Sequence, residues 1–336
     1  MSGGGDSVAL LHMFASWAGR ESGAAPVVLT VDHGLRAESA AEAELTVGWA
    51  RALGLSTHIL RWHGCKPEAN VEDKARAARY RLLGAWCIKN GVRNLFLAHT
   101  EDDLAETFLL RLGRGSGVDG LSAMRARAPL PCPGFEGVQV VRPLLGISRA
   151  QLRAYLPAKG ASWLEDPMNQ DERFARSRIR KAMPALEAAG ISPTRIAQAA
   201  QHLVRAREAL DAATEEFLCR HARFEGDFAL LDGAALARLP REIGLRALCA
   251  VLMRVGECVY RPRFERLEAL YDTVVPGEFA ARTLLGCRVG RAPKAARAAF
   301  GPPTLLIARE QPRRSTTGPT RQPAIKTAHG LEAETA

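Results

Sequence analysis

The sequence lacks any long hydrophobic run, and this excludes a membrane-spanning helix. Its longest uninterrupted apolar stretch reaches only from Ala247 to Met253, whereas a spanning helix needs about 20 predominantly apolar residues. The start of the chain also lacks the basic segment that introduces a secretory signal peptide. We therefore expect a cytoplasmic protein with no membrane association.

Closely spaced cysteines are absent as well. The chain holds seven cysteines, and the nearest two in sequence, Cys249 and Cys258, are nine positions apart. This spacing argues against a zinc ribbon, a thioredoxin-type redox pair and a disulfide framework. Small buried thiols in a reducing compartment account for such a scattered set.

The two commonest nucleotide-binding fingerprints are missing or stand in the wrong context. No segment matches the Walker A pattern G-x-x-x-x-G-K-[ST]. The glycines at 115, 117 and 120 have the spacing G-x-G-x-x-G, but they follow a predicted helix, whereas a Rossmann loop follows a strand. A nucleotide site in this chain must therefore be built differently.

Acidic residues are outnumbered by basic ones. The 336 residues include 46 lysines and arginines against 36 aspartates and glutamates, which gives a formal charge of +10. A hydrophobic fraction of 47% is ordinary for a folded protein, and the length suggests about two domains. The charge favours a polyanionic partner such as nucleic acid, although by itself it is weak support.

Short apolar runs alternate with helical spacing in the first half of the chain. Strand character is found at 27–31, 57–62, 94–99 and 138–145, and helical segments lie between these runs. This alternation predicts an α/β fold with a Rossmann-like, mostly parallel sheet. In such sheets, ligands bind at the carboxyl ends of the strands.

The second half has a different composition. Residues 191–218 are rich in alanine, arginine and glutamate, which predicts a helix, and proline, threonine and arginine dominate near the C-terminus. We therefore expect an α/β domain at 1–190, a smaller and mainly helical region at 191–300, and a disordered tail at 301–336.

A glycine-rich loop opens directly onto the first predicted helix. It consists of Ser2, Gly3, Gly4, Gly5, Asp6 and Ser7. Glycines let backbone N–H groups approach a phosphate, and a helix N-terminus favours an anion. Asp6 is placed to hold a magnesium ion on that phosphate. The alternative is an ordinary helix start in which Asp6 or Ser7 serves only as the N-cap.

Polar residues follow two of the predicted strands. Asp32 and His33 come after the first of these strands, and a segment beginning at His99 comes after the third. This segment contains Asp103 and Glu106, which are three residues apart and so share one face of a helix. Both groups are expected where open α/β sheets bind ligands. The alternative is that the acids only favour a helix N-terminus and that the histidine is structural.

Six motifs follow one another in a fixed order through this half of the chain. They are the loop at 2–7, Asp-His-Gly-Leu-Arg at 32–36, Ala-Arg-x-x-Arg-Tyr at 75–80, the acidic segment at 98–107, the glycine-rich segment at 110–121 and the run at 165–180. In sequence, order and spacing this set resembles the tRNA(Ile)-lysidine synthetase family. The resemblance covers about residues 2–190.

The resemblance implies a PP-loop fold of the N-type ATP pyrophosphatase (adenine nucleotide alpha hydrolase-like) class. It also implies a ligase activity. In this family ATP adenylates the carbon-2 oxygen of the wobble cytidine in a minor isoleucine tRNA. The amino group of free lysine then displaces AMP, and the product is lysidine.

Roles for individual residues follow from the same resemblance. The loop at 2–7 would bind the pyrophosphate of ATP, with Asp6 as the Mg²⁺ ligand, and Asp32 and His33 would lie near the adenosine. Asp103 and Glu106 would make a second cation contact or receive the lysine ammonium. The residues implied in catalysis are Asp6, Asp103, Glu106 and Arg176.

Arginines on two segments are expected to contact the tRNA backbone. They are Arg111, Arg114, Arg173, Arg176, Arg178 and Arg180. Arginine runs also occur on solvated, charge-rich helix faces that bind nothing. One or more of these side chains could instead stabilise the negative charge of a transition state.

Two other functions stay open at the level of sequence. PP-loop tRNA thiolases also act on tRNA cytidine, but they carry C-x-x-C pairs, which this chain lacks. A non-catalytic tRNA-binding protein with a decayed nucleotide loop is disfavoured because Asp6, Asp103 and Glu106 are all present.

The start of the chain raises a separate expectation. In PP-loop domains the glycine-rich loop follows a central strand, yet here Met1 directly precedes Ser2. A missing central strand would expose unpaired backbone in the middle of the sheet. We therefore expect that translation begins upstream and adds roughly 10–25 residues, including one β-branched strand.

Overall fold

The structure is a computed structural model that describes residues 1–18, 26–64, 66–67, 69–122, 124–165, 175–258, 260–277 and 280–310. The chain forms two compact units, Met1–Ala213 and Thr214–Ala336. Within the described ranges, no helix is long and apolar enough to cross a membrane.

Parallel strand pairing organises the first unit. β1 (Val27–Asp32) pairs in parallel with β2 (Ser56–Arg61). β3 (Asn94–Phe96) pairs in parallel with β5 (Gln139–Val141), and β4 (Arg127–Pro129) pairs antiparallel with the other edge of β5. The α/β class and the mostly parallel pairing expected from the sequence are confirmed.

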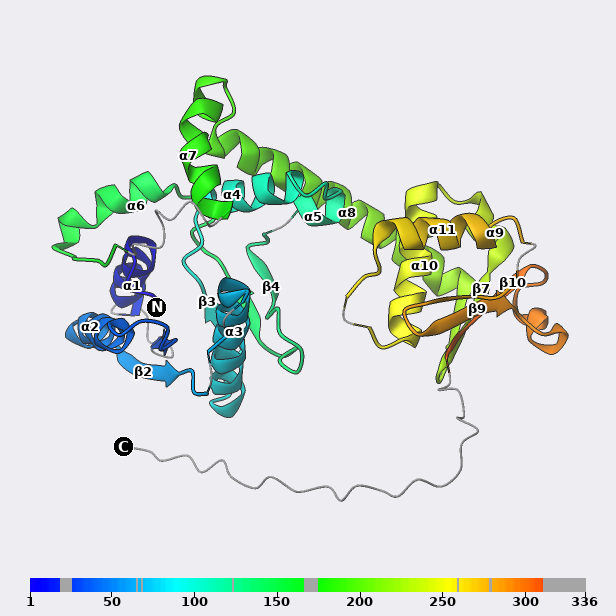
Figure 1. The fold of residues 1–336 in the computed structure, drawn as a ribbon, viewed down its shortest axis with the longest axis horizontal. Helices are drawn as coiled ribbons and strands as arrows, with labels where there is room; N and C mark the ends of the chain where they lie inside the picture. The colour runs from blue at the N-terminus through cyan, green and yellow to red at the C-terminus, as the bar shows by residue number, and fades with distance from the viewer. Residues whose placement is uncertain are drawn as a thin grey trace, which may run out of the picture. The chain divides into compact units, whose positions relative to one another are not determined.

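The helices of the first unit lie before, between and after these strands. They are α1 (Gly5–Ala18), α2 (Ser39–Ala52), α3 (Val71–Lys89), α4 (Glu101–Leu112), α5 (Val118–Leu121), α6 (Arg149–Tyr155), the 3₁₀ turn η1 (Pro157–Lys159), α7 (Ala175–Ala188) and α8 (Pro193–His221). As Figure 1 shows, α1 lies beside α6, and α4 lies beside α7. α2 packs on β1 and β2.

A buried apolar cluster fixes the beginning of the chain against α6. Val8 and Ala9 of α1 pack with Leu152 of α6 and with Leu156, which directly follows α6, and all four side chains are shielded from solvent. Burying a leucine side chain contributes about 1.5–3 kcal/mol. Because α1 begins at Gly5, within the glycine-rich segment 2–7, this packing also fixes the position of that segment.

β1 and β3 belong to different sheets. Among the described strands, none joins one to the other. The amino group of Met1 donates a hydrogen bond to the carbonyl oxygen of Leu29 on β1. The expected strand upstream of Ser2 stays a prediction.

An antiparallel sheet forms the centre of the second unit. Its strands are β6 (Ala222–Glu225), β7 (Phe228–Asp232), β8 (Arg282–Leu284), β9 (Cys287–Arg291) and β10 (Thr304–Arg309), in the order β6-β7-β10-β9-β8. The helices are α9 (Gly233–Arg238), α10 (Arg241–Val255) and α11 (Phe264–Val274), with a 3₁₀ segment η3 (Lys294–Ala299). α10 packs against β7 and β10.

The second half of the chain differs from the sequence-based expectation in three respects. Helices are present beyond residue 190, but they accompany a five-stranded sheet that the sequence did not predict. The division between the two units lies at Ala213, inside α8, and not at residue 190 as expected. The expectation of disorder from residue 301 is wrong for 304–309, where an apolar run forms β10 between β7 and β9. Residues 311–336 lie outside the described residues.

The central place of β10 leads to a stability prediction. The side chain of Ile307 is fully buried in the core of the second unit, so Ile307→Ala should lower the free energy of unfolding by about 2–5 kcal/mol. Leu306 points to the other face of the strand and is only half-buried, so Leu306→Ala should cost less than half as much. Chemical denaturation followed by circular dichroism measures both, and equal costs would contradict the assignment of β10.

Candidate active site

The loop at 2–7 has a backbone shape that only glycine permits at its second position. Gly3 has φ +83°, and a Cβ there would lie 2.8 Å from both Leu164 Cδ1 and Thr46 Oγ1. The carbonyl of Gly3 also accepts a hydrogen bond of 2.9 Å from the Leu164 N–H. The loop is therefore held on one side by the segment that follows α6.

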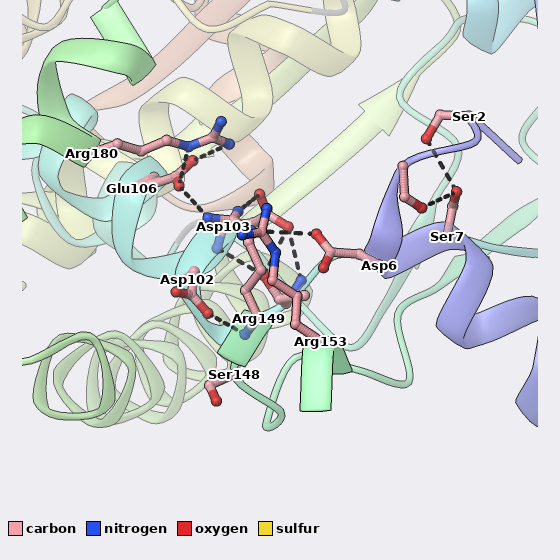
Figure 2. Close-up of polar contacts among 12 residues, drawn as sticks. Ser2, Asp6, Ser7, Asp102, Asp103, Glu106, Ser148, Arg149, Arg153 and Arg180 are labelled. Carbon is pink, nitrogen blue, oxygen red and sulfur yellow. Dashed lines mark hydrogen bonds and ion pairs between the residues drawn. The ribbon is translucent and has the colours of Figure 1, made fainter. Parts of the chain in front are cut away.

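Hydroxyl groups close the loop on its other side. The Ser7 hydroxyl donates to the Gly4 carbonyl at 2.8 Å, and the Ser2 hydroxyl donates to Ser7 Oγ at 3.3 Å. α1 begins at Gly5, so Asp6 lies in the first turn of the helix. Figure 2 shows Asp6 pointing away from these hydroxyls, toward the start of α4.

Asp32 and His33 lie together at the carboxyl end of β1. Asp32 Oδ1 accepts hydrogen bonds from the Gly34 N–H at 2.9 Å and from the Ser39 hydroxyl at 2.7 Å. Burial tends to raise the pKa of Asp32, but these hydrogen bonds and the charge of Arg61 bring it below its usual value. The pKa of His33 is lowered, mainly by burial. The pair thus presents an anion beside a neutral imidazole at neutral pH.

The start of α4 is fixed by a reciprocal cap. The Thr100 hydroxyl accepts a hydrogen bond from the Asp103 N–H, and Asp103 Oδ2 accepts from the Thr100 N–H at 2.9 Å. Thr100 is the N-cap of α4, since its hydroxyl reaches the N–H three residues on, and Asp102 accepts a hydrogen bond from the Arg149 N–H at 2.7 Å.

Arg149, which belongs to none of the six sequence motifs, brings the predicted acids together. Its Nε lies 3.4 Å from Asp6 Oδ2, its Nη2 lies 3.1 Å from Asp103 Oδ1 and its Nη1 lies 3.2 Å from Glu106 Oε1. Figure 2 shows the guanidinium between these three carboxylates. One side chain at the start of α6 therefore joins the phosphate loop to α4.

Glu106 has a second arginine partner. Its side chain is only 2% exposed, and Arg180 of α7 donates to both of its carboxylate oxygens, at 2.6 and 3.1 Å. A buried carboxylate needs such pairing, because an unpaired charge in the interior is very costly. Arg180, expected from the sequence to contact tRNA, is thus directed toward the acids.

The pKa values of the paired groups reflect burial and their neighbours' charges. Burial raises the pKa of Asp6, and the nearby Arg149 only partly opposes this shift. For Asp103 the upward effect of burial is outweighed by Arg149 and by the hydrogen bonds from Thr100, so its pKa is lowered. Burial would lower the pKa of Arg149, but Glu106, Asp103 and Asp6 raise it. Arg149 is therefore a permanent cation.

The other arginines singled out in the sequence have different surroundings. Arg176 Nη2 lies 3.4 Å from the Thr107 hydroxyl on α4, and Arg111 donates to the Gly120 carbonyl at 2.7 Å. Arg114 and Arg178 have exposed side chains. Arg173 lies outside the described residues.

A local sequence signal could have drawn attention to Arg149. Ser148 and Gln151 form a capping box, with the Ser148 N–H donating to Gln151 Oε1 at 2.9 Å, and the S-x-x-Q pattern predicts this helix start. A cation in the first turn opposes the helix dipole. An arginine in that position therefore indicates an acidic partner elsewhere in the fold.

The comparisons with known proteins agree with this architecture. A family model described as a PP-loop domain matches residues 1–186. The tRNA(Ile)-lysidine synthase of Bradyrhizobium sp. (strain BTAi1) is 39% identical over 324 residues, which cover 90% of this chain and 89% of that protein. The chain belongs to the tRNA(Ile)-lysidine synthase family of PP-loop proteins.

Other relatives in this family are longer than the present chain. The tRNA(Ile)-lysidine synthase of Ruegeria pomeroyi is 46% identical over 265 residues, covering 78% of this chain and 61% of that protein. The one from Wolbachia pipientis wMel is 38% identical over 293 residues, covering 86% of this chain and 67% of that protein. Membership of a PP-loop ATP pyrophosphatase family implies the use of ATP.

A solved structure shares the fold. The U34-tRNA thiolase NcsA from Methanococcus maripaludis, determined with its [4Fe-4S] cluster, matches with a TM-score of 0.52 and 17% identity. The match covers 61% of this chain and 71% of that chain. At this level of identity the likeness concerns the fold alone.

The environment of His99, which directly precedes the Thr100 cap, yields a pH-dependence prediction. Burial lowers its pKa to about 4, so the folded protein holds it neutral while the unfolded chain takes up a proton below about pH 6.5. This contribution to stability is fully present above that pH and is lost as the pH falls toward 4.

We expect the wild type to lose about 2–3 kcal/mol more stability between pH 7 and pH 4.5 than His99→Gln does. Denaturation with urea at a series of pH values measures the difference. His63 is exposed, so His63→Gln should follow the wild-type curve. Parallel curves for His99→Gln and the wild type would contradict a neutral, half-buried His99.

Proposed function

We propose that this protein joins free lysine to carbon 2 of the wobble cytidine in a minor isoleucine tRNA, using ATP. One observation carries the proposal: Asp6 of the phosphate loop and Asp103 and Glu106 of α4 converge on a single point. Acids at the start of α4 thus lie within reach of the loop where a nucleotide would be bound. Free lysine, ATP and tRNA are all present in the cytoplasm, where we propose that the reaction occurs.

In the first step, the carbon-2 oxygen of cytosine would attack the α-phosphorus of ATP, and pyrophosphate would leave. The glycine-rich loop and the N-terminus of α1 would hold the β- and γ-phosphates, because backbone N–H groups and the helix dipole favour an anion there. Asp32 and His33 at the end of β1 would lie near the adenosine. Arg176 would lie beside the negative charge that develops.

Magnesium would enter with the nucleotide. In the part of the chain that the structure describes, no group of three or more His, Cys, Asp or Glu side chains is placed to hold a metal. Mg²⁺ is commonly held by one or two carboxylates together with substrate phosphates. Asp6 in the first turn of α1 fits that role, since its carboxylate is 24% exposed and faces away from the loop hydroxyls. When bound, the ion would offset the charge of the leaving pyrophosphate.

In the second step, the amino group of lysine would attack carbon 2, and AMP would leave with the oxygen. Lysine would arrive as the ammonium and lose a proton to solvent before attack, since only the neutral amine is a nucleophile. Asp103 and Glu106 would bind the ammonium form and orient it. Asp103 Oδ1 is the more available acceptor once Arg149, now 3.1 Å away, has moved, since both oxygens of Glu106 are also bound by Arg180.

The structural neighbour that is a tRNA thiolase does not change this proposal. A sequence identity of 17% supports a shared fold but not a shared activity. The present chain also has no C-x-x-C pair to hold an iron–sulfur cluster. A non-catalytic tRNA-binding protein would have no need to keep three acids paired with arginines beside a phosphate loop. The ligase therefore accounts for more of the site.

The test uses purified protein, ATP, labelled lysine and a minor isoleucine tRNA transcript. We expect incorporation of lysine that requires all three substrates, and Asp6→Asn should lower its rate by at least about 100-fold with tRNA affinity unchanged. Asp73 is exposed on α3, so Asp73→Asn serves as the matched control and should be fully active. Sulfur transfer, or tRNA binding without ATP turnover, would contradict the proposal.

A second prediction concerns tRNA docking along α7. Arg178 has an exposed side chain on this helix, so Arg178→Ala should weaken tRNA binding. The slope of log Kd against log salt concentration should fall by about 1 for the lost phosphate contact. Arg178→Lys keeps the charge and should keep the wild-type slope. Unchanged affinity and slope in Arg178→Ala would remove this residue from the proposed tRNA contacts.

A further inference from the structure

Arg149 carries an inference that rests on the proposed function and deepens it. Each of its three guanidinium nitrogens faces a different carboxylate, from Asp6, Asp103 or Glu106. In the proposed reaction these same carboxylates are needed by other cations. Asp6 would bind Mg²⁺, and the acids of α4 would bind the lysine ammonium.

The guanidinium and the substrate cations therefore compete for one set of ligands. A carboxylate oxygen that already accepts from Arg149 is a poorer ligand for Mg²⁺ or for an ammonium group. Leaving the three carboxylates without a cation is also unfavourable, because their negative charges repel one another, and burial reduces the screening of that repulsion by water. The free protein resolves the conflict with an internal cation.

We propose that Arg149 is a positioning residue that blocks the lysine site until Mg²⁺·ATP has bound. If Mg²⁺ binds Asp6, Arg149 loses one of its three carboxylate partners, and the phosphates of the nucleotide offer it new anionic partners. The guanidinium then moves to the nucleotide, and Asp103 becomes free to accept the ammonium of lysine. ATP binding thereby precedes and promotes lysine binding.

The way Arg149 is held makes such an exchange possible. Its backbone is fixed, since its N–H donates to Asp102 and Ser148 caps the helix that it begins. Its side-chain contacts of 3.1–3.4 Å are at the long end of the hydrogen-bond range. By contrast, Arg180 approaches Glu106 to 2.6 Å. The Arg149 side chain can therefore swing about a fixed base while Arg180 keeps Glu106 neutralised.

The destination of the guanidinium also lies within reach. Nε of Arg149 is 3.4 Å from Asp6, which directly follows the last glycine of the loop. A guanidinium forms bidentate hydrogen bonds with phosphate oxygens as it does with carboxylates. A short movement of the side chain thus exchanges one set of anionic partners for another.

The test measures the Kd of labelled lysine by equilibrium dialysis, with and without Mg²⁺ and the non-cleavable analogue α,β-methylene-ATP. For the wild type we expect the nucleotide to tighten lysine binding by about 5–150-fold. In Arg149→Gln the block is absent, so lysine should bind tightly in both conditions, with Kd values that agree within about twofold. This readout is independent of turnover.

Two variants complete the experiment. Arg153 lies on the same helix and pairs with exposed Glu165 at 3.2 Å, so Arg153→Gln is the matched control and should retain the wild-type coupling. Arg149→Lys keeps the charge but concentrates it on one nitrogen, which spans the three carboxylates less well than the guanidinium fork does, so its coupling should lie between wild type and Arg149→Gln. Circular dichroism and thermal melting establish that each variant is folded.

The outcomes separate this inference from the proposed function. If the wild type forms lysidine but its Kd for lysine is the same with and without nucleotide, the proposed role of Arg149 is wrong and the ligase activity still stands. Coupling in Arg149→Lys equal to that of the wild type overturns the inference as well, even where Arg149→Gln does not fold. Failure of the wild type to bind or incorporate lysine under any condition, with tRNA present, overturns both.

Discussion

The convergence of carboxylates on one guanidinium is the interaction on which the rest of the site depends. Asp6 comes from the loop at the start of the chain, whereas Asp103 and Glu106 come from α4, about a hundred residues later. Ionised carboxylates that face one another repel, so a cation between these two segments favours their approach. Arg149 supplies that charge from a third segment, and its contacts therefore set how the phosphate loop lies relative to α4.

Backbone contacts and apolar packing hold the same three segments together independently of charge. The Glu101 N–H donates to the Ile147 carbonyl at 3.1 Å, and the Arg149 N–H donates to Asp102 at 2.7 Å, which ties the start of α4 to the start of α6. Leu152 of α6 and Leu156, the residue after it, are in turn buried against α1. Because the scaffold does not rely on the guanidinium alone, the Arg149 side chain can exchange partners while the helices keep their places.

Local patterns in the sequence predict the parts of this architecture that are local. The alternation of strands and helices predicts β1 and β2 and the segments between them, since hydrophobic period and helix length are properties of neighbouring residues. The pairing of Arg149 with Asp6 spans 143 positions and leaves no such pattern. For the same reason Arg180, seen in sequence as one of a run of arginines, could not be separated from its neighbours, although it holds Glu106 with two hydrogen bonds. β10 escaped prediction because its apolar run is short and lies in a segment dominated by proline and threonine.

The net positive charge of the chain explains why the carboxylates of Asp6, Asp103 and Glu106 matter for binding lysine. A formal charge of +10 attracts ATP and tRNA but repels the lysine cation. Solution salt screens such fields beyond about 8 Å, so a cationic substrate must be recognised by charges at short range. In the free protein the carboxylates of Asp6, Asp103 and Glu106 face two guanidinium groups, those of Arg149 and Arg180, and little negative charge is left to attract lysine. A bound nucleotide adds phosphates and draws Arg149 away. The site then becomes anionic at the moment when an adenylated base requires an amine.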